Sequence, residues 1–251
     1  MIDRHAVVTG GGTGIGSAIS TALAEAGAHV TVMGRRHAPL AALAAANANI
    51  SAITCDVTDP EEVAQAFREA AERSGPIGIL VNNAGAAPTT PFHKLAVDAW
   101  RQVMAVNLDA VFHCTRAVIE PMQAAGWGRI VNIASTAAQK GYAYVSAYCA
   151  AKHGVLGLTR ALALECATRG ITVNAVCPGY TDTDLVHSAV ANIMAKTGRS
   201  ESEALARFTG SNPQGRLVQP AEVAAAVLWL CQESSSAITG QAISVSGGEV
   251  M

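Results

Sequence analysis

The chain has 251 residues, of which 50% are hydrophobic and 14% are charged, and its formal net charge is −2. Such a composition supports one sizeable core, and the lack of a basic excess argues against nucleic acid or an anionic membrane surface as the main partner. The six cysteines form no CxxC pair, and no signal-peptide pattern or apolar run of about 18 residues occurs, so we expect a soluble, cytoplasmic protein with neither a disulfide framework nor a metal site.

A glycine-rich turn follows the first predicted strand, which covers residues 5–9. The segment TGGGTGIG leads from this strand into residues 17–28, which have helical periodicity. Gly10, Gly14 and Gly16 have a GxxxGxG spacing, which differs from the GxGxxG dinucleotide fingerprint. The physical basis is shared, because residues without a Cβ let the backbone approach a pyrophosphate at a helix N-terminus. We therefore expect a dinucleotide cradle, with a purely structural turn as the alternative.

The second predicted strand, at 28–33, ends in Gly34, Arg35 and Arg36. In a dinucleotide-binding unit, an acidic residue near this point would bind the ribose 2′-OH and favour NAD. Arginine instead suits a 2′-phosphate, because its planar fork binds phosphate through two hydrogen bonds. The sequence therefore favours NADP, unless both arginines only face solvent.

The remaining elements alternate between strands and helices. Further strands are predicted at 50–55, 77–81, 128–134, 171–176 and 243–245. Helices are predicted at 39–46, from 60 to about 73, over 97–125 with a break near Asn107, over 145–169 and from 220. Asp59 is the predicted N-cap of the second of these helices, with Pro60 at its first and Glu62 at its third position. This alternation predicts one α/β domain over residues 1–251, a Rossmann-type doubly wound parallel seven-stranded sheet with helices on both faces.

Three side chains between residues 135 and 152 can act together. Tyr148 and Lys152 are four residues apart and share one face of the predicted helix, and Ser135 ends the apolar run RIVNIAS thirteen residues before Tyr148. An ammonium group beside a tyrosine lowers its pKa from about 10. Such a tyrosine can exchange a proton with a carbonyl or alcohol oxygen, to which a serine hydroxyl can hydrogen-bond. Because YxxxK alone is a weak motif, a surface helix that merely carries both residues is the alternative.

The motifs also occur together in a familiar order. TGGGTGIG, NNAG at 82–85, a serine thirteen residues before YxxxK and the PG turn at 178–179 make the chain resemble the short-chain dehydrogenase/reductase family over essentially its whole length. The resemblance implies an oxidoreductase that moves hydride between a nicotinamide and a carbonyl or secondary alcohol. It implies that Tyr148 is the general acid/base, that Lys152 serves the tyrosine and the nicotinamide ribose, that Ser135 binds the carbonyl oxygen, and that Asn107 anchors a water beside Lys152. An asparagine that only bonds its own helix backbone is the alternative for Asn107.

The resemblance further places the cofactor along the chain. We expect NADP(H), with NAD(H) as the alternative, and we expect the PG turn to lie against the nicotinamide. The implied cofactor-binding residues are Gly10, Gly14, Ile15, Gly16, Arg35, Asp56, Val57, Asn83, Ala84, Gly85, Tyr148, Lys152, Pro178, Gly179, Thr181 and Thr183.

Residues 184–219 are more polar and resemble the substrate lid of the family. They contain Lys196, Arg199, Arg207 and Arg216, which could hold the phosphates of a coenzyme A or carrier-protein thioester or simply form a solvated face. Ser200 and Glu203 predict a capping box within this segment. The chain resembles 3-oxoacyl thioester reductases and 3-hydroxyacyl-CoA or 3-hydroxybutyrate dehydrogenases as a group, so we expect a 3-oxoacyl or 3-hydroxyacyl substrate. A secondary alcohol, sugar or cyclic ketone dehydrogenase is the first alternative, and a non-catalytic dinucleotide-binding regulator is the second.

The predicted helix at 145–169 also bears small residues that would let another helix approach closely. This pattern resembles the subunit-packing helices of the family and leads us to expect a homotetramer. The residues concerned are Ala147, Ala151, Gly154, Gly157 and Ala161.

Overall fold

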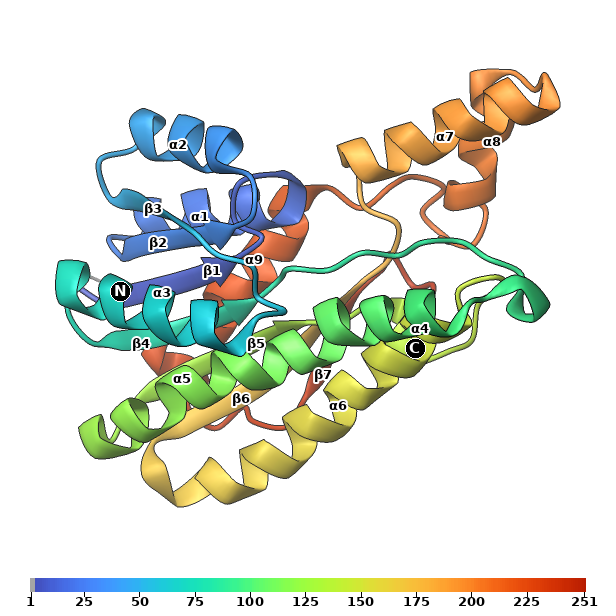
Figure 1. Cartoon of the computed structure of the whole chain (residues 1–251). Coiled ribbons are helices and arrows are strands. Elements are labelled where there is room, and N and C mark those ends of the chain that lie inside the picture. Colours follow the sequence, from blue (N-terminus) through green and yellow to red (C-terminus); the bar gives the residue numbers. More distant parts are fainter. Residues whose placement is uncertain (1–2) are drawn as a thin grey trace.

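Seven parallel strands form the centre of the structure, a computed structural model that describes residues 3–251. Their order is β3-β2-β1-β4-β5-β6-β7, which confirms the predicted doubly wound sheet (Figure 1). Each strand lies within two residues of its predicted bounds, and the first two residues of the predicted domain lie outside the described residues. The strands are β1 (His5–Thr9), β2 (His29–Gly34), β3 (Ile50–Thr54), β4 (Ile77–Asn82), β5 (Gly128–Ile133), β6 (Ile171–Pro178) and β7 (Ala242–Val245).

Helices cover both faces of this sheet (Figure 1). One face packs against α1 (Gly14–Glu25), α2 (His37–Ala46) and α9 (Pro220–Leu230). The other packs against α3 (Pro60–Ser74), α5 (Ala110–Ala125) and α6 (Ser146–Cys166), with α4 (Val97–Met104) beside α6. Because both faces are covered, the central strands are largely apolar, and every residue of β5 and β6 is buried.

The predicted break in the long helical region is a π-helical turn, residues 105–109, between α4 and α5. Asn107 lies at its centre and is fully buried. Its Nδ2 donates hydrogen bonds to the carbonyl oxygens of Val103 and Ala86, both at 2.9 Å. The Asn107 side chain thus hydrogen-bonds to a backbone carbonyl of the preceding turn, which explains why the regular helical hydrogen-bond pattern is interrupted here.

The segment predicted as a lid forms two helices, α7 (Asp184–Thr197) and α8 (Glu201–Thr209). They lie beyond the carboxyl ends of the strands, at the upper right of Figure 1. They pack on each other around a small apolar cluster that includes Val186, Val190 and Ala204. The predicted capping box at Ser200 and Glu203 is confirmed.

Asp59 caps α3 as predicted, with Pro60 and Glu62 at the expected first and third positions, and the Glu62 carboxylate accepts a hydrogen bond from the Asp56 backbone N–H at 2.8 Å. One local prediction needs correction. The small residues of α6 do not form one outward stripe, because Ala147 and Ala151 are buried and a Cβ at Gly154 would lie 2.9 Å from Leu108 of the same chain. Gly157 and Ala161 are exposed as expected.

Within residues 3–251, no helix combines the length and the apolar character needed to cross a membrane.

Tyr144, in the loop before α6, has a backbone φ of 69°, in the left-handed region that disfavours residues with a Cβ. Its carbonyl oxygen accepts a hydrogen bond from the Thr90 N–H at 2.7 Å, and its side chain is exposed. We predict that Tyr144→Gly is more stable than Tyr144→Ala by about 1 kcal/mol, because both remove the side chain and only glycine relieves the strain. Urea unfolding of the two variants measures this difference. Equal stability would show that the backbone here is not strained.

Candidate active site

Two adjoining cavities open at the carboxyl ends of the strands, beneath α7. The first, of about 320 Å³, is bordered by Ser135, Tyr148 and Lys152. The second, of about 490 Å³, is bordered by the glycine turn and by Arg35 and Arg36. Shared lining residues make the two cavities continuous; they are Ile15, Asn83, Gly85, Thr183 and Leu185. The second cavity lies where β1 has β2 on one side and β4 on the other, which is the expected position of a dinucleotide in a doubly wound sheet.

The glycine turn cannot carry side chains at its central positions. Gly10 and Gly14 have φ values of 62° and 53°, which other residues rarely adopt. A Cβ at Gly16 would lie 2.2 Å from the Gly10 carbonyl oxygen, so this glycine is also required by the packing of the turn itself. The turn therefore leads directly into the N-terminus of α1, whose backbone N–H groups face the cavity as an anion site would require.

Thr9 joins this turn to the end of β4, a role that the sequence did not reveal. Its Oγ1 accepts hydrogen bonds from the backbone N–H groups of Asn83 at 3.0 Å and Ala84 at 3.1 Å. The Asn83 side chain returns two hydrogen bonds, to the carbonyl oxygens of Thr9 and Gly10. The NNAG segment thus holds the glycine turn in place as well as lining both cavities.

The cavity at the end of β2 is suited to a phosphate. Arg35 and Arg36 both border it, and Gly34 occupies the place where an acid would favour NAD. Asp56, across the cavity, accepts hydrogen bonds from the backbone N–H and the hydroxyl of Thr58. Burial acts to raise the pKa of Asp56, but these hydrogen bonds and the charge of Arg35 outweigh burial and hold it below the usual range. Among the described residues, the donors present therefore fit a 2′-phosphorylated dinucleotide.

In the other cavity, Ser135 is held by the start of a short 3₁₀ turn, residues 136–138. Its Oγ accepts a hydrogen bond from the Ala137 N–H at 3.0 Å and is hydrogen-bonded to the Tyr148 hydroxyl. The structure thus joins the strand end and the helix face that the sequence separates by thirteen residues.

Lys152 is almost completely buried, with 4% of its surface exposed. Its Nζ donates a hydrogen bond to the Ile133 carbonyl oxygen at 2.7 Å and lies 5.7 Å from the centre of the Tyr148 ring. Burial lowers the pKa of Lys152 to about 8, and the nearby Cys177 opposes this only in part. The side chain therefore remains mainly an ammonium ion near neutral pH.

The pKa of Tyr148 is raised to about 12, which is opposite to the lowering predicted from Lys152. Burial is the largest cause, and the hydrogen bond with Ser135 acts in the lowering direction without overcoming it. The phenolate would lose its solvation in the same buried surroundings as the lysine, and this cost disfavours the charged form of the tyrosine. A tyrosine that stays protonated is the form that can donate a proton to a carbonyl oxygen.

Asn107 and Lys152 face the same point. A Cβ at Gly85 would lie 2.7 Å from the Asn107 Oδ1 and 3.8 Å from the Lys152 Nζ. The Asn107 side chain bonds its own helix backbone at Val103, as the alternative interpretation states, and it also ties down Ala86 at the start of the next loop. The predicted role of Asn107 in holding a water remains a prediction.

The PG turn closes the cavities from the opposite side. The Thr181 Oγ1 donates to the Gly179 carbonyl oxygen at 3.0 Å, and the Thr183 Oγ1 donates to the Thr181 carbonyl oxygen at 3.2 Å. A Cβ at Gly14 would lie 3.1 Å from the Thr183 Cγ2, so this turn meets the glycine turn directly.

Every residue predicted for catalysis or cofactor binding borders one of the two cavities, and their individual roles remain predictions. Sequence reasoning missed other lining residues, among them Thr13, Val106, Ser188, Thr136, Tyr142, Tyr180 and Phe208. Thr13 could have been found from its place inside the glycine turn. The aromatic residues come from three separate segments, and the sequence carries no signal that brings them together.

Comparison with known proteins places these features in a family. The sequence profile described as short chain dehydrogenase matches residues 4–193. An acetoacetyl-CoA reductase of Shinella zoogloeoides is 39% identical over 248 residues, which cover 99% of each chain. A D-beta-hydroxybutyrate dehydrogenase of Rhizobium meliloti is 38% identical over 253 residues, which cover 98% of each chain. The crystal structure of an actinorhodin polyketide ketoreductase variant with NADPH matches with a TM-score of 0.94 at 39% identity, covering 98% of this chain and 97% of that one.

The buried ammonium of Lys152 makes stability depend on pH. Below about pH 8 both the folded and the unfolded chain hold this proton, so the full destabilisation by burial is present. Between that pH and the ordinary lysine pKa of about 10.4, the folded chain binds fewer protons than the unfolded chain, so stability rises with pH. We predict that Lys152→Met is more stable than the wild type by on the order of 2 kcal/mol near neutral pH, and that this gap closes by about pH 10.

Urea unfolding at a series of pH values measures the gap. The matched control is Lys94→Met, because Lys94 is exposed and its removal should give a gap that does not change with pH. A Lys152→Met variant that is less stable than the wild type near neutral pH would contradict the prediction.

Proposed function

Because the chain belongs to the short-chain dehydrogenase family, we propose that it uses NADPH to reduce the keto group of a neutral 3-oxoacyl thioester. The protein is an NAD(P)-dependent oxidoreductase that transfers hydride between a nicotinamide and a carbonyl or secondary alcohol. The family relationship and the assembled catalytic set argue against a non-catalytic dinucleotide-binding regulator.

One observation supports a neutral substrate above all. Among the described residues that border the reaction cavity, Lys152 is the single cation, and it is engaged by the Ile133 carbonyl oxygen. The rest of the lining consists of small, aliphatic, amide, hydroxyl and aromatic side chains. A free 3-oxo acid would bring a carboxylate into this cavity without a cationic partner, which costs several kcal/mol, whereas a thioester brings no charge. This favours the substrate type named in the acetoacetyl-CoA reductase over that named in the hydroxybutyrate dehydrogenase.

In the proposed mechanism, the bound NADPH supplies the hydride, and the protein supplies the proton and the orientation. Tyr148 donates its proton to the carbonyl oxygen as charge develops there. Ser135, fixed by the Ala137 N–H, hydrogen-bonds the same oxygen. Lys152 provides positive charge beside the tyrosine and a hydrogen-bond donor for the nicotinamide ribose, and Asn107 supports the route by which the proton is replaced.

Arg35 and Arg36 are proposed to hold the 2′-phosphate, with the glycine turn and the N-terminus of α1 on the pyrophosphate. Asp56 and Val57 would lie against the adenine side, and the PG turn with Thr181 and Thr183 would lie against the nicotinamide.

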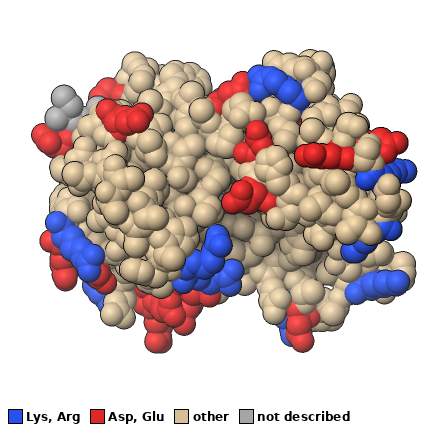
Figure 2. All heavy atoms as spheres, turned by 90° about the horizontal axis from the view of Figure 1, so that it is seen from above, with Lys and Arg blue, Asp and Glu red and all other residues tan. Residues whose placement is uncertain are grey.

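The part of the thioester beyond the acyl group would extend out of the cavity. Arg216 is not free to bind it, because its guanidinium makes two hydrogen bonds to the Glu222 carboxylate, at 2.6 and 2.7 Å. The remaining lid cations are Lys196, Arg199 and Arg207. Seen from above, the surface is hollowed and the Lys and Arg side chains do not form one continuous patch around it (Figure 2). Contacts to a phosphorylated carrier would therefore be few.

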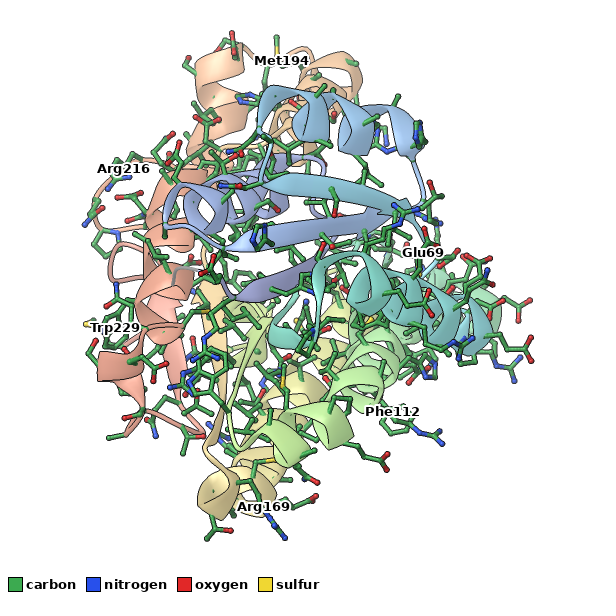
Figure 3. All side chains as sticks on the ribbon, turned by 90° about the vertical axis from the view of Figure 1, so that its left-hand side faces the viewer. Glu69, Phe112, Arg169, Met194, Arg216 and Trp229 are labelled. Atoms are coloured by element: carbon green, nitrogen blue, oxygen red, sulfur yellow. The ribbon has the colours of Figure 1, made fainter. Side chains whose placement is uncertain are left out.

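A homotetramer in the cytoplasm is proposed for the assembled protein. Phe112 on α5 and Trp229 on α9 lie at opposite outer surfaces (Figure 3), and they are 49% and 42% exposed. Leu164, Gly157 and Ala161 of α6 are exposed as well. All six cysteines of the chain are described and free, which supports a reducing compartment.

The first test compares a thioester with its free acid. We predict that kcat/KM with NADPH is at least about 100-fold higher for acetoacetyl-CoA than for acetoacetate, because only the acid places an unpaired charge in the cavity. The oxidation of NADPH is followed by absorbance. The acetoacetyl thioester of N-acetylcysteamine, which lacks the phosphates, serves as the control for the carrier portion. Equal or better turnover of acetoacetate would overturn the proposed substrate class.

The second test concerns the cofactor. We predict that Arg35→Asp weakens NADPH binding at least about 10-fold, because a charge-assisted bond is lost and a repulsion is gained, while NADH binding changes little. Binding is measured by fluorescence titration of the nicotinamide. Arg207→Asp makes the same change of charge in the lid and should leave both affinities near the wild-type values. Unchanged NADPH affinity in Arg35→Asp would count against the assignment.

A further inference from the structure

Three aromatic rings form one wall of the reaction cavity. Tyr142 comes from the loop before α6, Tyr180 from the PG turn and Phe208 from α8. The Tyr142 and Tyr180 rings meet edge to face with centroids 6.2 Å apart, and the Tyr180 and Phe208 rings do so at 5.0 Å. Such a wall offers edges and faces to a flat group on a bound substrate.

Tyr142 is held from behind by Glu249, near the end of the chain. The Tyr142 hydroxyl donates a hydrogen bond to the Glu249 Oε1 at 2.5 Å, and the Glu249 side chain is only 1% exposed. The Lys140 Nζ lies 3.1 Å from the same oxygen, and Ser211 also hydrogen-bonds the carboxylate. Burial acts to raise the pKa of Glu249, but these partners outweigh it and hold it below the usual range. The carboxylate therefore remains charged and acts as a fixed acceptor for Tyr142.

The local sequence explains how Glu249 reaches Tyr142. Gly247 and Gly248 have φ values of 62° and 92°, and they turn the chain back beneath the lid segment. A Cβ at Gly247 would lie 2.1 Å from the Asn212 Oδ1, and a Cβ at Gly179 would lie 3.0 Å from the Glu249 Oε2. Glu249 thus lies directly behind the PG turn, which borders the reaction cavity and carries Tyr180.

The same arrangement reaches the catalytic serine. The Tyr142 hydroxyl is also hydrogen-bonded to the Thr136 Oγ1 at 2.7 Å, and Thr136 directly follows Ser135. A buried carboxylate is destabilising unless it is well partnered, and one partner of this carboxylate, Tyr142, borders the cavity. Its contacts point to a role in the shape of the site.

We propose that Glu249 is a positioning residue that fixes Tyr142 in the cavity and so makes the enzyme selective for 3-oxoacyl groups that carry a flat or ring-shaped substituent beyond the keto carbon. The inference rests on the proposed ketone reduction. A ring seated on a fixed Tyr142 gains an aromatic contact that a methyl group cannot make, and a mobile Tyr142 loses most of that gain.

The test compares two N-acetylcysteamine thioesters, the 3-oxo-3-phenylpropanoyl and the acetoacetyl, in five proteins. We expect the wild type to prefer the phenyl substrate by kcat/KM. We expect Glu249→Gln and Tyr142→Phe each to lower this preference about 10-fold, mainly through KM for the phenyl substrate. The double variant should lower it no further, because both changes remove the same hydrogen bond. Glu233→Gln, which alters an exposed carboxylate, should keep the wild-type preference.

Three results would overturn the inference: no preference in the wild type, an equal loss on both substrates in the variants, or additive losses in the double variant. Tyr142→Phe keeps the ring and adds no buried charge, so the test stands even if Glu249→Gln fails to fold. The same ratio is measured with a phenyl and a methyl diketone that lack the thioester. Turnover of the diketones without turnover of either thioester would refute the proposed substrate class and leave the role of Glu249 to be read from the diketone ratio.

Discussion

The ammonium group of Lys152 lies out of solvent against the carbonyl oxygen of Ile133, and the reaction site is arranged around that contact. A buried ammonium lowers stability, so its surroundings must fix it firmly. The end of β5 provides the carbonyl acceptor, α6 places the tyrosine one turn earlier, and the π-helical turn at Asn107 brings an amide to the same point beside Gly85. Burial of the ammonium group thus lowers the stability of the folded chain, and it places a positive charge next to a phenol that remains protonated.

The two cavities differ in the charge of the side chains that line them. The cofactor end contains Arg35 and Arg36 beside the glycine turn, whereas the reaction end has a lining that is neutral apart from Lys152. This separation lets an anionic dinucleotide bind at one end while the acyl group enters an uncharged space at the other. The neutral lining also favours a substrate that has no carboxylate near the keto group. This preference comes from the lining as a whole and not from one residue.

Much of this architecture follows from short-range sequence signals. The strands are largely apolar runs, Asn107 marks the interruption of a helix, and Ser200 with Glu203 caps another, so these features could be predicted. The direction of the Tyr148 pKa shift could not, because it depends on how deeply two neighbouring groups are buried together. The contact between Tyr142 and Glu249 could not be foreseen either, since 107 residues separate them and the turn at Gly247 that joins them is a tertiary feature. Likewise, the sequence could not show that Gly154, one of the small residues expected to admit another helix on α6, packs on Leu108 of the same chain.

The central claim is that Tyr148 gives the proton in carbonyl reduction, and the most direct measurement is single-turnover oxidation of NADPH by acetoacetyl-CoA in Tyr148→Phe. The variant keeps the ring and removes only the hydroxyl, and NADPH binding is measured beside it so that lost affinity is not mistaken for lost chemistry. We predict a rate at least about 100-fold below that of the wild type with the cofactor bound. A rate within a few-fold of the wild type would show that a group other than Tyr148 supplies the proton.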